Sequence, residues 1–387
     1  MIEAVFKPVL SGYPLSELQE LLHPLPRFRV KQIFSWISRG VRSFAEMTDL
    51  SQSLRADLGE RFSLYASEVA ARLKDPDGTE KLQISLRDGC LIEAVLLTDG
   101  EERRTACLST QAGCPQGCVF CKTGALPFRR NLDSAEIVEQ FLHLRGAAAD
   151  GDADANTISN IVIMGMGEPM LNLAELRRAV SVFTASEGFG LSGRRITVST
   201  SGIAAGIRDL ADNGPRVRLA LSLTTADTAL REHLMPVTKS NPLPEVKAAL
   251  QHYQQCEGRR ITLEMVLLGG LNTRREDVDA LQAFIRGLDA VINLIPWNPV
   301  EGMSFAGRPL REPEPGELAA FMAELEQRGI AFTRRYRKGR TIGGACGQLG
   351  GMREPYSLTT RDRVSTSTPS PVTSTSFSRR QPPWTGS

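Results

Sequence analysis

The sequence predicts an α/β fold in which a small helical accessory domain precedes a partial (β/α)6 barrel and a disordered tail follows it. From about residue 90, short β-branched runs alternate with amphipathic helical stretches, and repeated βα units of this kind build parallel sheets. Before that point, apolar residues have helical spacing, whereas the last residues are rich in Ser, Thr and Pro. We therefore expect an accessory domain at residues 1–75, a barrel with an N-terminal strand extension at 76–350, and a tail at 351–387.

The accessory domain is predicted to contain three helices. Apolar residues recur three and four positions apart in residues 15–22, 29–38 and 50–61, as they do on the buried face of an amphipathic helix. The segment Pro26–Ile37 also mixes basic and aromatic residues at helical spacing. Two interpretations stay open for this segment, a solvated amphipathic helix and a surface that contacts a nucleic-acid backbone.

The barrel is predicted from strands and helices that alternate along the chain. The candidate strands are 106–109, 158–164, 195–199, 218–223, 261–268, 291–296 and 331–335. The candidate helices are 135–146, 173–186, 204–212, 243–256, 274–288 and 316–328. Six or more such units favour a full or partial barrel, and the active site of such a barrel lies at the carboxyl ends of its strands. Side chains just after each strand are therefore the first candidates for a functional site.

The composition restricts the class of protein. The formal net charge of +2 does not mark a general nucleic-acid binder, so any basic binding surface is expected to be local. Seven cysteines, three of them clustered, are typical of a reducing compartment rather than of a disulfide scaffold. The N-terminus lacks a basic segment followed by an apolar one, and no apolar run is long enough to span a membrane. We expect a cytoplasmic protein that is not in a membrane.

Three cysteines, Cys114, Cys118 and Cys121, follow the first barrel strand with the spacing C-x3-C-x2-C. A four-iron cluster normally takes four thiolates, so a loop with three leaves one iron open to a non-protein ligand. Structural zinc is the alternative, because Cys107 is available as a fourth ligand. The spacing by itself establishes three soft ligands on one short loop.

Polar or glycine-rich segments follow several other predicted strands. They are Gly165–Pro169, which contains one carboxylate, Ser199–Gly202, Ser222–Thr224 and Ile295–Pro299. Each signal is weak alone, because glycine turns and helix N-caps are common after strands. Together, at the same edge of one sheet, they indicate a single ligand pocket.

The order of these motifs resembles the radical S-adenosylmethionine (SAM) enzymes, and among them the adenosine-C2 methyltransferases of large-subunit ribosomal RNA and certain transfer RNAs. The similarity runs from Arg29 to about Leu349 and includes Glu46–Leu50. It implies a 4Fe-4S cluster on the three cysteines and two SAM molecules per turnover. By position, the residues implied to contact SAM are Gly167, Glu168, Ser199, Ser222, Leu223, Thr224 and Asn298. The family motif at the fourth strand reads Ser-Leu-His, and Thr224 replaces that histidine.

The resemblance also implies three catalytic residues. Carbon 2 of adenine is electron-poor, and the family first places the methyl group on a cysteine, which corresponds to Cys346 attacking SAM as a thiolate. A radical from the second SAM activates that methyl for addition to carbon 2. Cys107 would then release the RNA by forming a disulfide with Cys346, and Glu93 would accept the ring proton. The segment between Glu93 and Cys107 is one residue longer than the family pattern. Taken alone, Cys107 and Cys346 are each more typical of a buried inert thiol. A surface carboxylate is the alternative for Glu93, although an unpaired carboxylate is costly in the apolar run that contains it.

Flanking glycines indicate that Cys346 is an exposed, mobile thiol. Local basic clusters are the expected RNA contacts. They are Arg103–Arg104, Lys122 with Arg129–Arg130, Arg194–Arg195 and Arg334–Arg340.

The implied substrates are ribosomal RNA at the peptidyl transferase centre and transfer RNA next to the anticodon. The implied electron donor is a flavodoxin or a ferredoxin, and a monomer is expected. Three alternatives stay open: methylation of carbon 8 of the same base, a non-catalytic iron-sulfur or zinc RNA-binding protein, and an activase that makes a glycyl radical on a partner. Cys107 and Cys346 separate the methyltransferases from a structural protein, which needs no such free thiols, and an activase would need neither Cys346 nor Glu93.

Overall fold

The predicted α/β barrel is confirmed by a computed structural model, which describes residues 6–99, 103–148, 158–335 and 338–351. Within these ranges the main sheet has ten strands in the order β1-β2-β3-β4-β7-β8-β9-β10-β11-β14. The predicted tail lies outside the described residues, apart from Gly351. No described helix has the length and apolarity needed to cross a membrane.

The accessory helices form where the apolar spacing predicts them. They are α1 (Leu15–Leu21), α2 (Arg27–Arg39) and α3 (Gln52–Arg61). Helix α2 buries Val30, Ile33, Phe34 and Ile37, which share one helical face. It ends at Gly40, whose φ of 83° is the left-handed conformation that glycine adopts without strain.

Part of the segment expected to be helical is a strand instead. β1 (Ser67–Lys74) pairs antiparallel with β2 (Glu80–Leu86), which pairs in turn with β3 (Leu91–Asp99). β1 is an edge strand whose residues after Ser67 are mostly exposed or half-exposed, so it lacks the apolar alternation that marks a strand in a sequence. β1, β2 and β3 are the strand extension, and β3 joins them antiparallel to β4 (Arg103–Cys107).

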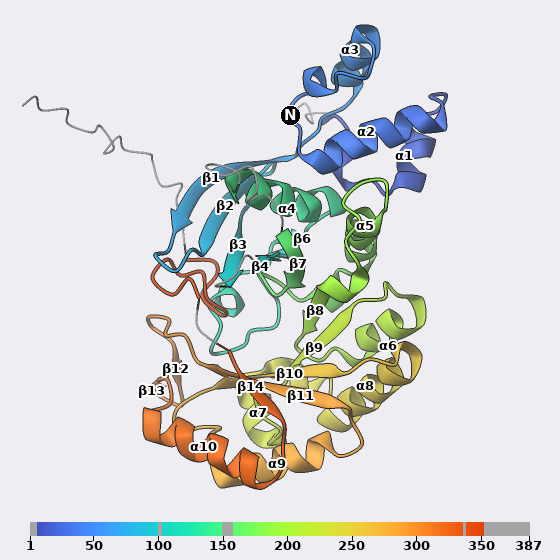
Figure 1. Ribbon diagram of the computed structural model, residues 1–387. Helices are drawn as coiled ribbons and strands as arrows, with labels where there is room; N and C mark the ends of the chain where they lie inside the picture. Colours follow the sequence, from blue (N-terminus) through green and yellow to red (C-terminus); the bar gives the residue numbers. More distant parts are fainter. Residues whose placement is uncertain (1–5, 100–102, 149–157, 336–337, 352–387) are drawn as a thin grey trace, which may run out of the picture. The chain divides into compact units, whose positions relative to one another are not determined.

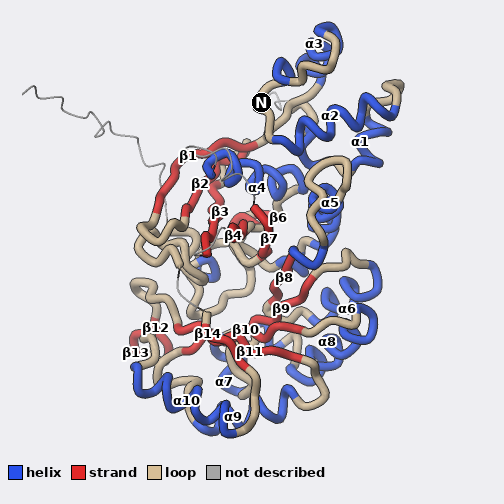
Figure 2. Tube along the Cα trace, viewed as in Figure 1, coloured by secondary structure: helices blue, strands red, loops and turns tan. Residues whose placement is uncertain are grey.

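The barrel proper starts at β4, and every later pair of neighbours in the sheet is parallel. Its other strands are β7 (Ile158–Ile163), β8 (Ile196–Thr200), β9 (Arg218–Ser222), β10 (Ile261–Leu267), β11 (Ala290–Pro296) and β14 (Phe332–Arg334). The connecting helices are α4 (Ser134–Ala148), α5 (Leu173–Thr184), α6 (Ala204–Asn213), α8 (Leu243–Glu257), α9 (Arg275–Ile285) and α10 (Pro315–Gln327). A further helix, α7 (Thr228–Leu234), was not predicted. Among the described residues β1 and β14 do not pair, so the barrel is partial (Figures 1 and 2).

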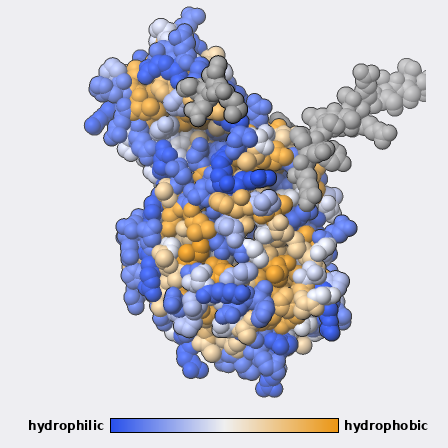
Figure 3. Space-filling view, turned by 180° about the vertical axis from the view of Figure 1, so that it is seen from behind, coloured by the Kyte–Doolittle hydropathy of each residue, from blue (hydrophilic) through white to orange (hydrophobic). Residues whose placement is uncertain are grey.

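The hydrophobic core lies between the sheet and the outer helices. It is continuous with the accessory domain, because Val30 and Ile33 of α2 belong to the same buried cluster as Ile161 and Leu263 of the barrel strands. On the face seen in Figure 3, hydrophobic and neutral side chains concentrate over the middle, and hydrophilic side chains cover the margins.

Candidate active site

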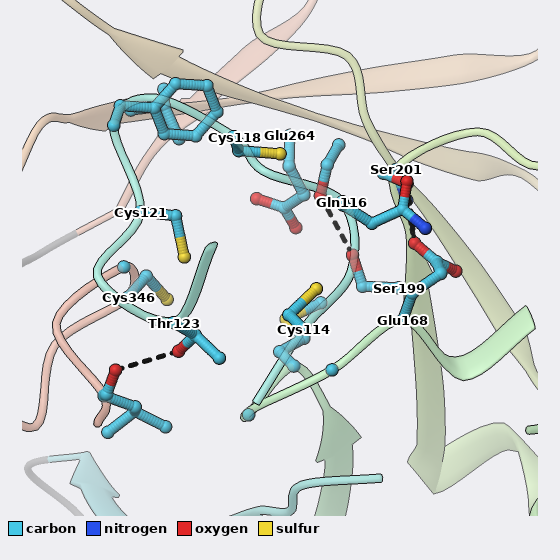
Figure 4. A pocket seen from close by; sticks show the side chains of 18 of the residues that line it. Cys114, Gln116, Cys118, Cys121, Thr123, Glu168, Ser199, Ser201, Glu264 and Cys346 are labelled. Atoms are coloured by element: carbon cyan, nitrogen blue, oxygen red, sulfur yellow. Dashed lines mark hydrogen bonds between the residues drawn. The ribbon is translucent and has the colours of Figure 1, made fainter. Parts of the chain in front are cut away.

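A cavity lies at the carboxyl ends of the barrel strands, where the predicted motifs meet. It is lined by the cysteine loop, by the ends of β7 to β11, and by the segment that carries Cys346 (Figure 4). We call the loop of residues 113–125 the cluster loop and residues 338–351 the Cys346 segment. The structure thus brings together parts of the chain that are more than 200 residues apart.

The cluster loop directs Cys114, Cys118 and Cys121 into this cavity (Figure 4). The loop turns at Gly113, where φ is 83° and an added Cβ would lie 2.2 Å from the Pro127 carbonyl oxygen, so only glycine fits. The indole Nε1 of Trp297 donates to the Phe120 carbonyl over 2.9 Å and holds the far side of the loop.

The sulfur positions decide between zinc and a larger cluster. Among the described residues, the group whose ligand atoms all lie within 4.8 Å of one another is Asp212, His252 and Cys256 on the outer helices, and the loop cysteines form no such group. Sulfur ligands of one zinc ion would be closer together, since a Zn–S bond is about 2.3 Å long. In this structure the three sulfurs are therefore not gathered as the ligands of one zinc ion would be, and the loop offers the three thiolates that would hold a four-iron cluster.

The loop thiols deprotonate with difficulty because they are buried, unless a bound metal cluster stabilises their thiolate form. Burial raises the pKa of Cys114 to about 12 and also raises the pKa values of Cys118 and Cys121. Thiolate is the form that binds metal. A bound iron cluster supplies the positive charge that such buried sulfurs need.

Glu168 is fixed at the end of β7 as a buried carboxylate. Its Oε2 accepts hydrogen bonds of 2.7 Å from both the backbone N–H and the Oγ of Ser201, and its Oε1 accepts from the Met170 N–H at 3.1 Å. Burial raises the pKa of Glu168. The preceding Gly167 has a φ of 107°, and an added Cβ would come within 2.6 Å of the Gln111 Cβ, so the glycine allows this turn to pack closely.

Other predicted SAM contacts line the same cavity. The Oγ atoms of Ser199 and Ser222 lie 3.2 Å apart across neighbouring strands. Asn298 donates from Nδ2 to the Cys346 carbonyl over 3.0 Å, whereas its buried Oδ1 has no hydrogen-bond partner in the protein. A buried amide oxygen without a partner is costly, so this atom fits a ligand that donates a hydrogen bond there.

Leu223 and Thr224, also predicted as SAM contacts, lie behind the cavity wall. The Leu223 side chain is in the hydrophobic core. Thr224 adopts a φ of 61°, which is unusual for a residue other than glycine, and its buried Oγ1 has no hydrogen-bond partner in the protein. The cavity-lining residue of this motif is Ser222.

Two buried charged residues of the site were not predicted. Glu264, on β10, points into the cavity and accepts from Asn293 Nδ2 at 2.6 Å (Figure 4). Arg231 lies in the unpredicted α7, and donates to the carbonyls of Ser201 and Ser222 at 2.7 and 3.1 Å. An acidic residue in an otherwise apolar strand was a signal for Glu264, whereas Arg231 had no such signal.

A second cavity adjoins the first and contains both predicted catalytic cysteines. Cys107 and Cys346 line it together with Arg194, Arg195 and Arg335. Cys346 also lines the first cavity, so it lies at the junction of the two. Burial, and secondarily the neighbouring Cys346, raises the pKa of Cys107 to about 12. Both cysteines are free thiols.

Cys346 is half-buried rather than exposed, and its segment is hydrogen-bonded to other parts of the chain at several residues. The segment contacts the cluster loop through the Lys122 N–H, which donates to the Gly347 carbonyl at 2.8 Å. Thr123 Oγ1 donates to the Leu349 carbonyl at 2.8 Å. An added Cβ would lie 2.7 Å from Thr79 Cγ2 at Gly339 and 2.3 Å from Leu126 Cδ1 at Gly350, so these two glycines permit close packing.

Glu93 is buried on β3 and is not a surface residue. Its exposed fraction is 2%, and its Oε2 accepts from the Gly350 N–H at 3.0 Å and lies 3.3 Å from Lys81 Nζ. It lines neither of the two cavities. The structure therefore places Glu93 directly behind the Cys346 segment.

The predicted basic clusters differ in what they contact. Arg130 is paired with Asp88 and Glu136, so two carboxylates within the protein already balance its charge. The side chain of Arg103, with Tyr336 and Arg337, lies outside the described residues. The cations that line the second cavity are Arg194, Arg195, Arg218, Arg334, Arg335 and Lys338.

A parallel barrel with a three-cysteine loop at the carboxyl ends of its strands defines a radical SAM enzyme, and the model of the Radical SAM superfamily matches residues 108–282. Within this class, the chain belongs to the RlmN family. It is 49% identical over 345 residues to "Probable dual-specificity RNA methyltransferase RlmN" of Treponema denticola, which covers 89% of this chain and 96% of that protein. It is 40% identical over 354 residues to the protein of the same name from Thermus thermophilus, covering 91% of this chain and 95% of that one.

The accessory domain and the whole fold agree with this assignment. The model "Ribosomal RNA large subunit methyltransferase N-terminal domain" matches residues 10–64. The crystal structure of a radical SAM methyltransferase from Sphaerobacter thermophilus is similar with a TM-score of 0.82 and 38% identity, covering 89% of this chain and 99% of that chain. The predicted family, enzyme class and cofactors, a 4Fe-4S cluster and SAM, are thereby confirmed.

Proposed function

We propose that this enzyme methylates carbon 2 of an adenosine in large-subunit ribosomal RNA, at the peptidyl transferase centre, and in transfer RNA next to the anticodon. The observation that carries the proposal is the position of Cys346 at the junction of the two cavities. One cavity holds the cluster cysteines, and the other holds Cys107 and several arginines. A thiol at this junction is accessible from the cofactor side and from the RNA side.

Each cavity has its own binding residues in this proposal. Cys114, Cys118 and Cys121 hold the cluster, while Glu168, Ser199 and Asn298 orient SAM. When bound, the cofactors supply the methyl group, the carbon radical that removes a hydrogen atom from it, and the site that takes back one electron. Arginines of the second cavity bind the phosphates beside the target base. The electron comes from a flavodoxin or a ferredoxin.

Cys346 acts first, as a nucleophile. Its thiolate forms a bond to the methyl carbon of SAM as the carbon–sulfonium bond breaks, and S-adenosylhomocysteine leaves. After hydrogen removal, the carbon on Cys346 adds to carbon 2 of the adenine. This step joins the RNA covalently to Cys346.

Release requires a base and a second thiol. The adduct loses one electron and its ring proton, and the proton goes to Glu93, which lines neither cavity and therefore requires the Cys346 segment in front of it to shift at this step. Cys107 then bonds through its sulfur to the sulfur of Cys346, while the bond from that sulfur to the RNA breaks. The thiol proton of Cys107 completes the new methyl group, and a dithiol reductant returns the disulfide to two thiols.

The decisive experiment reconstitutes the protein anaerobically with iron, sulfide and SAM and examines the Cys346 peptide by mass spectrometry. We expect a methylated Cys346 and, after addition of RNA and reductant, 2-methyladenosine in the digested RNA. An unmodified Cys346 beside an intact cluster and bound SAM would overturn the proposal. Formation of 8-methyladenosine would instead assign the carbon-8 reaction.

A further inference from the structure

The Cys346 segment is attached to the strand extension rather than to the barrel at several of its residues. Asp77 Oδ2, in the β1–β2 turn, accepts from the Gly339 N–H at 2.8 Å. Asp75 Oδ2, in the same turn, accepts from the Thr341 N–H at 3.1 Å and from its Oγ1 at 2.6 Å. The start of the segment is therefore fixed by two carboxylates outside the barrel.

A buried ion pair continues this attachment on both sides of Cys346. Lys81, on β2, lies 3.3 Å from Glu93, and the side chains are 3% and 2% exposed. Lys81 Nζ also donates to the Gly343 carbonyl at 3.2 Å, three residues before Cys346. Glu93 accepts from the Gly350 N–H, four residues after it. The pair thus contacts the segment before and after the reactive thiol.

Burying the charges of Lys81 and Glu93 costs desolvation free energy that two apolar side chains would not cost. Burial lowers the pKa of Lys81, and the nearby Glu93 opposes that shift. A buried ion pair often contributes no more stability than apolar residues of similar size. What the pair supplies instead is geometry, because its two charges fix one carbonyl and one N–H of the same segment.

We propose that Lys81 is the positioning residue of the Cys346 segment. Through Gly343 it holds Cys346 at the junction of the cavities, and through Glu93 it holds the carboxylate that contacts Gly350. The effect of Lys81 on turnover rests on the function proposed above, whereas its effect on the exposure of Cys346 does not.

The test compares Lys81→Met with Lys74→Met in the reconstituted enzyme. Lys74 is a matched control, because it also pairs with a carboxylate in the strand extension, 3.5 Å from Glu80, but its side chain is 67% exposed. Peptide mass spectrometry monitors the alkylation of Cys346 and distinguishes it from alkylation of the exposed Cys256. We expect Lys81→Met to raise the Cys346 alkylation rate and to lower its methylation rate, each by about 10-fold to 100-fold.

Lys81→Gln is the second variant, because an amide still donates to Gly343 but carries no charge, and we expect partial recovery of both rates. Alkylation and methylation at wild-type rates in Lys81→Met would overturn the inference, whatever the loss in melting temperature. If wild-type Cys346 is never methylated, the proposed function fails, but the alkylation rates still decide the role of Lys81. If Lys81→Met does not fold, equal rates in Lys81→Gln and wild type would overturn it.

Discussion

The cluster loop and the Cys346 segment both contain several glycines and both carry cysteines of the candidate site, yet they are held in different ways. The cluster loop is closed by local turns and by the indole of Trp297. The Cys346 segment depends on charged side chains of the strand extension, among them Asp75 and Lys81. Both segments are therefore held by distant parts of the chain, the cluster loop by a neutral indole and the Cys346 segment by buried or partly buried charges.

The largest effect is expected from removing a ligand of the iron cluster, because the cluster loop has no substitute for it. Cys118→Ser should abolish activity and reduce bound iron to the level of the unreconstituted protein, because three thiolates are the minimum that holds this cluster. Iron content and the production of 5′-deoxyadenosine from SAM are the measurements. Cys90→Ser, which changes a half-buried thiol outside both cavities, is the control and should behave as wild type.

A substitution of Cys107, in the second cavity, should allow the methyl carbon to join the RNA but prevent release of the RNA from Cys346. Cys107→Ser should keep the cluster and the methylation of Cys346, but RNA should remain attached to Cys346, since a hydroxyl does not resolve the thioether. We expect at least about a hundredfold loss of free product. A covalent protein–RNA band on a denaturing gel measures the effect. Free methylated RNA at the normal rate would contradict the assigned role of Cys107.

Glu93→Gln tests whether Glu93 accepts the ring proton or only supports the Cys346 segment. The amide oxygen can still accept from Gly350, so methylation of Cys346 should persist, whereas product formation should fall by about 10²-fold to 10⁴-fold because the proton acceptor is lost. The ratio of methylated Cys346 to methylated RNA measures how far the first step proceeds without the second. Normal turnover would remove Glu93 from the mechanism and leave it as a support of the segment.

The smallest effect concerns how the strand extension is anchored to the barrel. Glu139 of α4 is buried and accepts from Ser67 at the start of β1 and from the Ala66 N–H. Burial raises the pKa of Glu139 to about 7, from an ordinary value of 4.5. Because this pKa is higher in the folded protein, the stability from the neutral acid is present at low pH and is lost as pH rises through about 7.

His143, which also contacts Ser67, has the opposite dependence, because burial lowers its pKa to about 4. Glu139→Gln isolates the carboxyl contribution. Between pH 4.5 and 7 the variant should gain stability relative to wild type by up to about 3 kcal/mol. Urea unfolding at several pH values measures this, and a difference that does not change with pH would show that Glu139 does not titrate in this range.

The sequence alone predicted the features that depend on residues close together in the chain. The spacing of the three cysteines identified the cluster loop, and β-branched runs located the carboxyl ends of the barrel strands. It was insufficient where contacts join distant positions. Lys81 and Gly343 are separated by 262 positions, and no local pattern marks that Lys81 is buried. The edge strand β1 and the short helix α7 were missed because neither has the apolar periodicity on which such predictions depend.

The meeting of two cavities at Cys346 also has a consequence for inhibitor design. Glu264, Asn298 and Arg335, like Cys346, line both cavities. A molecule that joins an adenosyl group to a nucleobase through a short linker could occupy both compartments at once. Such a compound would contact the residues that the two cavities share, and its affinity would depend on both compartments.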